Sequence, residues 1–183
     1  MKDRRIILGV TGSIAAYKAA ELASALVREG AEATAVMTQA AQRFVTPLTF
    51  EALTRHPVVT DMWTRTAHRE PVHVRLAEWG DLMVVAPASA NFIGKCANGI
   101  ADDMLSCLAL AVPNPLLIAP AMNDVMYRHP AVQENLDTLK RRGCHIIAPV
   151  EGRLASGKVG VGRLAPVHDI LAVIRDELGK RTR

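Results

Sequence analysis

The first segment suited to chemistry is a predicted turn formed by Thr11, Gly12, Ser13 and Ile14. This turn follows an apolar run and precedes a helical pattern, and a helix N-terminus offers free N–H groups and a dipole that favour an anion. Gly12 lets a ligand approach the backbone, and Ser13 supplies a hydroxyl. The turn therefore indicates a phosphate site, and an ordinary turn with a serine N-cap is the alternative.

The kind of nucleotide is indicated by what the turn lacks. It is not a GxGxxG sequence, and Met37-Thr38 follows the second expected strand, where a dinucleotide site places an acidic ribose ligand. This pattern favours a mononucleotide over a dinucleotide. The Thr38 hydroxyl is a candidate for a second phosphate contact.

Two further segments with the same layout follow later apolar runs. The first, residues 87–91, reads Pro-Ala-Ser-Ala-Asn, and its small residues allow a flat ring to approach while Ser89 and Asn91 offer hydrogen bonds. The second, residues 120–123, reads Pro-Ala-Met-Asn, and the amide of Asn123 can donate to a carboxylate. Helix caps and an ordinary turn asparagine are the alternatives for these side chains.

A histidine and a glycine-rich stretch complete the candidate set. His73 stands in the first turn of an expected helix, where it is either a general base or a polar surface residue. Residues 152–163 contain four glycines, which predicts a mobile loop that closes over a substrate. Arg153, Lys158 and Arg163 in this stretch are candidates for holding a phosphate or carboxylate, and a plain surface loop is the alternative.

Alternating strand-like and helical segments must position these residues. Strands are expected at 5–10, 31–37, 81–86, 115–119 and 144–148, with Pro87 and Pro120 ending two of them. Helices are expected at 14–29, 46–53, 72–79, 89–97, 102–111, 130–142 and 166–178. This order predicts an α/β fold, in which one three-layer, Rossmann-like or flavodoxin-like domain over residues 1–183 is built on a parallel sheet. Ligands of such sheets bind beyond the carboxyl ends of the strands.

The composition of the chain limits the classes of partner and environment that are expected for it. The net charge of +4 over 183 residues comes without an aromatic-laced basic stripe, so a nucleic-acid partner is not expected. The longest apolar stretch, residues 107–122, contains three prolines and predicts no membrane span. Cys96, Cys107 and Cys144 are odd in number and widely spaced, which argues against disulfides and a metal site and favours the cytoplasm.

Taken together, the five segments resemble one family. Residues 12–18 (Gly-Ser-Ile-Ala-Ala-Tyr-Lys), 87–91 and 120–123 are similar to the motifs of the homo-oligomeric flavin-containing cysteine decarboxylases. The resemblance runs from about Arg5 to Leu178, and the glycine-rich stretch resembles the substrate-recognition clamp of that family.

The resemblance implies FMN as the cofactor, no metal, and a role for each matching residue. His73 would be the catalytic base, Asn123 would bind the substrate carboxylate, and Ser156 stands at the position of the clamp's proton donor. The implied FMN contacts are Gly12, Ser13, Ile14, Thr38, Gln39, Ala40, Ser89, Ala90, Asn91, Phe92 and Ala121. The implied substrate contacts in the clamp are Arg153, Leu154, Ala155 and Gly162. Family members form homotrimers or dodecamers with shared active sites, and the module is often joined to a synthetase domain.

The implied activity is decarboxylation of 4′-phosphopantothenoylcysteine to 4′-phosphopantetheine in coenzyme A biosynthesis. Hydride transfer from the carbon bearing sulfur would give a thioaldehyde β to the carboxylate, so that loss of carbon dioxide leaves an enethiolate, which then regains the hydride. Ser156 replaces a common clamp cysteine, a much stronger acid, and Phe92 replaces a common threonine. Oxidative decarboxylation of a peptide's C-terminal cysteine and a non-catalytic regulatory flavoprotein are the alternatives, and a flavin prenyltransferase is a more distant one.

Overall fold

A five-stranded parallel sheet forms the centre of the computed structural model, which describes residues 1–63, 71–155 and 157–180. The strands are β1 (Arg5–Val10), β2 (Glu32–Met37), β3 (Leu82–Ala88), β4 (Leu116–Pro120) and β5 (His145–Ile146), in the order β2-β1-β3-β4-β5. This is a doubly wound order of the flavodoxin type, so the predicted fold class is confirmed.

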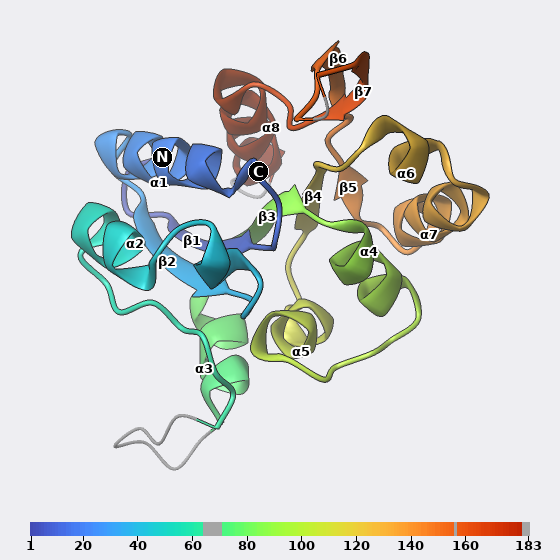
Figure 1. Cartoon of the computed structure of the whole chain (residues 1–183). Helices are drawn as coiled ribbons and strands as arrows, with labels where there is room; N and C mark the ends of the chain where they lie inside the picture. The colour runs from blue at the N-terminus through green and yellow to red at the C-terminus, as the bar shows by residue number, and fades with distance from the viewer. Residues whose placement is uncertain (64–70, 156, 181–183) are drawn as a thin grey trace.

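Helices cover both faces of the sheet (Figure 1). One face packs against α1 (Ala16–Arg28), α2 (Pro47–Thr54) and α8 (Val167–Lys180). The other packs against α3 (Val72–Trp79), α4 (Ala90–Ala97), α5 (Met104–Ala111) and α7 (Pro130–Arg141). Because successive side chains of a strand point to opposite faces, Ile6 and Leu8 join the first core while Ile7 joins the second. Both faces are buried, which explains why the strands are continuous apolar runs.

Of the two prolines expected to end strands, Pro120 ends its strand as predicted and Pro87 lies inside its strand. β3 continues through Pro87 to Ala88, and Pro120 is the last residue of β4. The register between β3 and β4 shifts between Val85 and Ala88. Proline lacks the N–H that a regular ladder needs, and the irregular register removes that requirement at Pro87.

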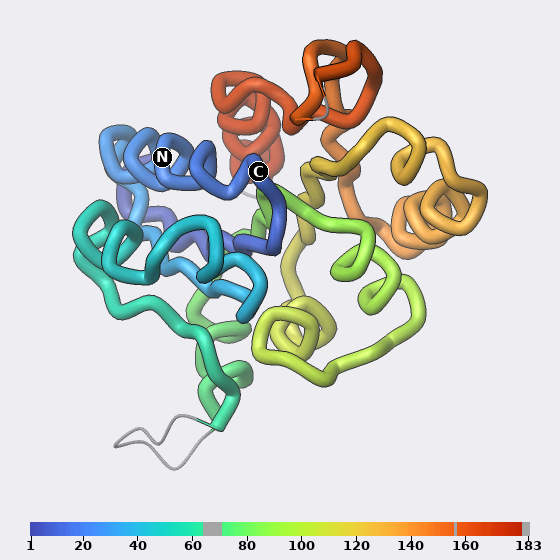
Figure 2. The backbone as a smooth tube through the Cα atoms, in the orientation of Figure 1, coloured from blue at the N-terminus to red at the C-terminus, as the bar shows by residue number. Residues whose placement is uncertain are grey.

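The glycine-rich stretch differs most from its prediction. Residues expected to form a mobile loop form a two-stranded antiparallel hairpin of β6 (Val150–Arg153) and β7 (Val159–Arg163). Its tip is closed by the Leu154 N–H, which donates to the Lys158 carbonyl at 2.8 Å, and by Gly157, whose φ of +84° suits glycine. The chain trace shows the hairpin beside the short helix α6 (Asp124–Arg128), which the sequence did not predict (Figure 2).

The remaining differences are small. A 3₁₀ turn, η1 (Ala41–Arg43), follows β2, and β5 is shorter than expected. Within the described ranges, no helix combines the length and apolar character needed to span a bilayer. The same residues contain no cluster of histidine, cysteine, aspartate and glutamate suited to a metal ion.

Candidate active site

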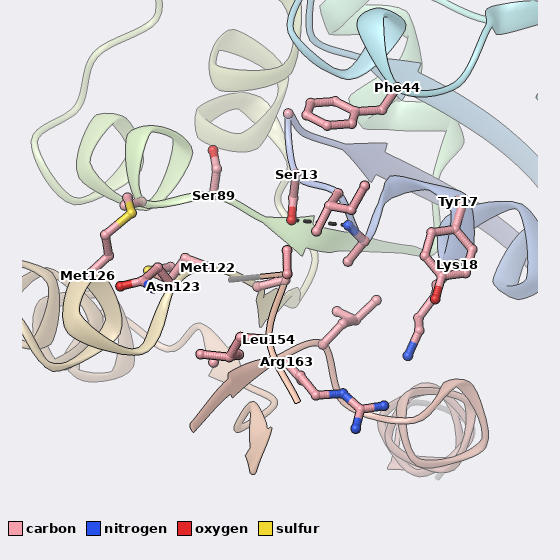
Figure 3. Close-up of a pocket in the computed structure, with 18 of the residues that line it drawn as sticks. Ser13, Tyr17, Lys18, Phe44, Ser89, Met122, Asn123, Met126, Leu154 and Arg163 are labelled. Carbon is pink, nitrogen blue, oxygen red and sulfur yellow. Dashed lines mark hydrogen bonds between the residues drawn. The ribbon is translucent and has the colours of Figure 1, made fainter. Parts of the chain in front are cut away.

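A cavity of about 680 Å³ lies at the carboxyl ends of β1, β3 and β4 (Figure 3). This volume is typical of sites for small molecules and cofactors. The cavity borders the point between β1 and β3 where the strand order reverses, which is where sheets of this type bind ligands. Its lining comprises Gly12, Ser13, Ile14, Ala15, Tyr17, Lys18, Phe44, Ser89, Ala90, Ala121, Met122, Asn123, Met126, Arg153, Leu154, Ala155, Gly162, Arg163 and Leu164.

The turn after β1 is built to receive an anion. Within the described part of the chain, the backbone N–H groups of Gly12, Ser13 and Ile14 donate no hydrogen bond. The turn also packs tightly, because a Cβ added at Gly12 would lie 2.5 Å from the Cβ of Ala40. Three free donors in the turn before α1 fit the phosphate of a mononucleotide, and Gly12 lets this turn pack against Ala40.

Thr11 fixes this turn relative to the end of β3. Its buried hydroxyl, 1% exposed, donates to the Pro87 carbonyl at 2.7 Å and accepts from the Ser89 N–H at 2.8 Å. Ser89 in turn caps α4, since its Oγ accepts from the Phe92 N–H. One threonine therefore sets the spacing between two walls of the cavity, a role that the sequence analysis did not assign.

The Asn123 segment forms the third wall. The Ala121 N–H donates to the Ala88 carbonyl at 3.0 Å, which ties the end of β4 to the end of β3. Asn123 Oδ1 accepts from the Val125 N–H at 2.9 Å and caps α6. Because the cap uses Oδ1, the amide Nδ2 is the end of this side chain left to donate to a ligand.

The hairpin is attached to this third wall by its glycine face. The Met122 N–H donates to the Gly162 carbonyl at 3.0 Å. A Cβ at Gly162 would lie 2.3 Å from the Met122 carbonyl oxygen, and one at Gly160 would lie 2.9 Å from the Cβ of Asp124. Two glycines on one side of β7 thus let its backbone rest on the backbone of the Asn123 segment. This contact holds the base of the hairpin in place.

Asp124 lies under this contact and is nearly buried, with 8% of the residue exposed. Its Oδ2 accepts from the Arg128 Nη2 at 2.7 Å, one helical turn away. Its Oδ1 is buried and has no hydrogen-bond partner among the described residues. The carboxylate is therefore held at the root of α6 by a single arginine.

The structure brings eleven of the predicted site residues together. These are Gly12, Ser13, Ile14, Ser89, Ala90, Ala121, Asn123, Arg153, Leu154, Ala155 and Gly162. Five predicted flavin contacts do not line the cavity, namely Thr38, Gln39, Ala40, Asn91 and Phe92. Thr38 Oγ1 accepts from the Ala41 N–H at 3.2 Å, and the Phe92 side chain is buried in the core at 2% exposure. Phe92 therefore serves packing, and its N–H serves the cap at Ser89.

One predicted catalytic residue does not line this cavity, and another is not placed by the structure. His73 is half-buried on α3, which lies at the opposite end of the molecule from the hairpin (Figure 1). Ser156 lies outside the described residues. One chain therefore does not bring His73 to Asn123.

Several lining residues were missed by the sequence analysis. They are Ala15, Tyr17, Lys18, Phe44, Met122, Met126 and Leu164, and Arg163 was noted only as part of the clamp. Tyr17 and Lys18 belong to the quoted motif of residues 12–18, so their closeness to the phosphate turn was the available signal. Phe44 had no such signal, because its position depends on how η1 folds back toward α1.

The three cysteines do not line the cavity. Burial raises the pKa of the Cys96 thiol to about 12 and also raises the pKa of Cys144. These two thiols are therefore protonated at neutral pH and poorly nucleophilic.

The sequence was compared with known proteins. It is 48% identical to the coenzyme A biosynthesis bifunctional protein CoaBC of Bacillus subtilis, over 182 residues that cover 100% of this chain and 45% of that protein. The CoaBC protein of Escherichia coli K12 is 42% identical over 164 residues, 90% of this chain and 40% of its own length. The chain thus spans less than half the length of these curated relatives.

Two solved structures share the fold closely. A PPC decarboxylase mutant complexed with pantothenoylaminoethenethiol has a TM-score of 0.84 and 33% identity, with 95% of this chain and 97% of that chain covered. The FMN-dependent cysteine decarboxylase SpaF has a TM-score of 0.84 and 35% identity, with 98% of each chain covered. The family described as Flavoprotein matches residues 1–179, and the chain belongs to this family.

Proposed function

We propose that this chain catalyses the FMN-dependent decarboxylation of 4′-phosphopantothenoylcysteine to 4′-phosphopantetheine. The observation that carries the proposal is the cavity, in which a phosphate-binding turn, the Asn123 amide and a clamp-like hairpin converge. Similarity to CoaBC proteins and to a PPC decarboxylase supports the choice of substrate. We expect the reaction to take place in the cytoplasm, in keeping with three free cysteines, and the bifunctional relatives suggest a synthetase domain or partner that supplies the substrate.

The flavin would be held by the walls after β1, β3 and β4. The free N–H groups of Gly12, Ser13 and Ile14 would bind its phosphate. Ala90 and Ala121, which have small side chains, line the cavity where a flat ring needs close backbone contact. When bound, FMN supplies reversible hydride transfer, the chemistry that side chains lack.

The chain's own residues position the substrate and handle protons. Asn123 Nδ2 would donate to the substrate carboxylate, since Oδ1 is engaged by the α6 cap. Leu154, nearly buried at the base of the hairpin tip, would cover the reacting end and exclude water. Ser156 would relay the final proton in place of a cysteine, and its hydroxyl is a weaker acid, which predicts a slower last step.

His73 would reach the site from another copy of the chain. It does not line the cavity of its own chain, and exposed apolar side chains stand around the cavity: Ile14 is 60% exposed, Tyr17 61% and Phe44 51%. Large apolar side chains gathered on one surface mark protein contacts. A homotrimer, alone or assembled into a dodecamer, would bury this surface and complete each site with a neighbour's histidine.

Turnover tests the proposal directly. The FMN-loaded protein is incubated with 4′-phosphopantothenoylcysteine, and the masses of the products are measured by mass spectrometry. Loss of carbon dioxide alone is the expected result. Loss of carbon dioxide and two hydrogens would show that Ser156 fails to support reprotonation, and no product from the flavin-loaded protein would overturn the proposed activity.

Subunit complementation tests the origin of His73. His73→Asn and Asn123→Asp are each expected to bind FMN and to be inactive. After denaturation and joint refolding of the two variants, about a quarter of the sites in a random cyclic oligomer combine intact His73 with intact Asn123. Recovery of roughly that share of activity supports a shared site, whereas no recovery in mixed oligomers argues that both residues act within one chain.

A peptide substrate is the second candidate. SpaF, an FMN-dependent cysteine decarboxylase, is as similar to this chain in fold as the PPC decarboxylase is. Oxidative decarboxylation of a peptide's C-terminal cysteine to an enethiol needs no final reprotonation at carbon, which fits Ser156. Competition between a cysteine-terminated peptide and 4′-phosphopantothenoylcysteine separates the two substrates.

A further inference from the structure

We infer that Lys18 and Arg163 form a subsite for the substrate's terminal phosphate, at the opposite end of the cavity from Asn123. This inference rests on the proposed function and adds to it the feature that would select a phosphorylated small molecule over a peptide. Neither cation belongs to the flavin-binding turn of residues 12–14 or to the Asn123 segment.

Both cations face the same end of the cavity although they come from different elements. Lys18 lies in the first turns of α1, and Arg163 is the last residue of β7. Both line the cavity, and Figure 3 shows their side chains extending toward the same region, with Asn123 and Met126 on the other side. A ligand with a carboxylate at one end and a phosphate at the other matches this polarity.

Neither cation has an anionic partner within the described ranges. The ion pairs of those residues use other cations, such as Arg5, Lys95 and Arg175, and include neither Lys18 nor Arg163. Two like charges facing one cavity repel each other, and a bound dianion relieves that repulsion. Arginine binds phosphate through two parallel N–H donors and lysine adds a point charge, so the pair suits this group.

The hairpin itself places the guanidinium. A Cβ added at Gly152 would lie 2.3 Å from Arg163 Nη1 and 2.8 Å from Arg163 Cδ. The arginine therefore crosses over Gly152 of the opposite strand, and any side chain there would displace it. Since Gly162 fixes the neighbouring backbone against Met122, the guanidinium is held in register with the Asn123 wall.

The flavin phosphate has its own donors, which is why these cations are assigned to the substrate. The free N–H groups of residues 12–14 lie in the turn before α1, whereas Lys18 is a side-chain cation of the first turn of the helix itself. Arg163 belongs to the hairpin that would cover the substrate. The two phosphates thus have separate sites along one cavity.

The test measures the preference for phosphorylated over unphosphorylated substrate as a ratio of kcat/KM values. The substrates are 4′-phosphopantothenoylcysteine and pantothenoylcysteine, and the variants are Lys18→Gln, Arg163→Gln and their combination. Each single change is expected to reduce the preference about 10- to 100-fold, the usual effect of losing one hydrogen bond to a charged group. Gly152→Ala should reduce it less, because it moves the guanidinium and keeps the charge. Arg141→Gln, on the outer face of α7, should leave the preference unchanged.

Measurements of flavin content and of product binding distinguish failure of the subsite from failure of the proposed function. A preference that survives in the double variant overturns the subsite, and so does loss of FMN from Lys18→Gln or Arg163→Gln, which would assign these cations to the cofactor phosphate. Calorimetry with 4′-phosphopantetheine and pantetheine tests the subsite without turnover. If the wild-type protein turns over neither substrate but binds the phosphorylated product more tightly, the proposed activity fails and the subsite stands. Equal binding of the two products would refute the subsite.

Discussion

Two parts of the cavity lining, the flavin wall and the hairpin wall, are built in different ways. The flavin wall, formed by the turn after β1 and the residues after β3, is tied together by the buried hydroxyl of Thr11. Among the described residues, the hairpin wall is attached to the Asn123 segment through one backbone hydrogen bond, from Met122 to Gly162, and through glycines that permit close contact. Its outer residues are solvent-exposed, with Val159 at 68%.

This difference matches the two tasks of the site. A cofactor that stays bound through many turnovers needs donors in fixed positions, which buried hydrogen bonds provide. A substrate that enters and leaves suits a wall that is joined to the rest of the site by fewer contacts. Changes in the flavin wall should therefore affect folding and FMN binding together, while changes in the hairpin should affect turnover alone.

The largest effect is expected from Thr11→Val. Valine has nearly the same shape but lacks the hydroxyl, so the Ser89 N–H loses its acceptor and the Pro87 carbonyl loses a donor. The free energy of unfolding should fall by about 1–3 kcal/mol, because the Ser89 N–H is left without an acceptor, while the Pro87 carbonyl keeps only the Thr11 N–H. Urea denaturation of the apoprotein measures the stability, and fluorescence titration with FMN should show affinity reduced about 10- to 100-fold.

Thr54→Val is the matched control. Thr54 is also buried and donates to the Phe50 carbonyl at 2.8 Å within α2, away from the cavity lining. This variant should lose stability while keeping its FMN affinity. If Thr11→Val also kept its FMN affinity, the view that Thr11 aligns the flavin wall would be wrong.

Gly162→Ala should have the next largest effect, and on turnover. The added methyl would lie 2.3 Å from the Met122 carbonyl oxygen, a backbone atom that cannot rotate away, so β7 must lift off the Asn123 segment. A displacement of about 1 Å in a positioning group can lower kcat/KM about 100-fold. FMN content should remain at the wild-type level, which absorbance of the purified protein checks.

Gly179→Ala provides the control for this change, because a Cβ at Gly179 meets no atom within 4 Å. Turnover of that variant should equal that of the wild type. Loss of FMN from Gly162→Ala would contradict the comparison, since it would show that the hairpin also supports the cofactor.

The difference between the flavin wall and the hairpin wall also explains which features of the structure could be predicted from the sequence. The strands and the turn of residues 12–14 depend on local patterns, namely apolar runs and a serine beside glycine before a helix, and these were predicted correctly. The hairpin was not predicted, because most of its glycines lie in its strands and not at its tip. Gly160 and Gly162 meet Asp124 and Met122, which are distant in sequence, and no local pattern reports that contact.

Two other residues show the same limit. Thr11 was quoted only as part of a turn, and its importance comes from Pro87 and Ser89, which lie 76 and 78 positions away. His73 was chosen by residue type and resemblance, and its distance from the cavity emerges only from the packing of α3 on the far side of the molecule. Sequence patterns predict which helix or strand a residue belongs to. They do not predict which helices and strands pack together, because that depends on the tertiary fold.

The smallest effect concerns the support behind the flavin wall. Lys95 of α4 donates to Asp103 Oδ2 at 2.7 Å, and Asp103 caps α5 by accepting from the Ser106 N–H. Burial tends to raise the pKa of Asp103, but hydrogen bonds from Lys95 and Ser106 outweigh it and hold the pKa below its ordinary value. Because the folded-state pKa is depressed, this carboxylate stabilises the fold above its unfolded-state pKa of about 4, and the stabilisation is lost as the pH falls through the folded-state pKa.

Asp103→Asn keeps a cap acceptor and removes the charge, so the free energy of unfolding at pH 7 should fall by only about 0.5–1 kcal/mol. The difference from the wild type should shrink as the pH falls below about 4, where the wild-type carboxylate becomes protonated. Asp103→Ala should cost about 1 kcal/mol more, because the cap is lost as well. Urea melts of the three proteins between pH 7 and pH 3 measure these differences. A gap between wild type and Asp103→Asn that stays constant over this range would mean that the Lys95 ion pair contributes nothing, and that α4 is held behind the flavin wall by its apolar packing against α5 and α7.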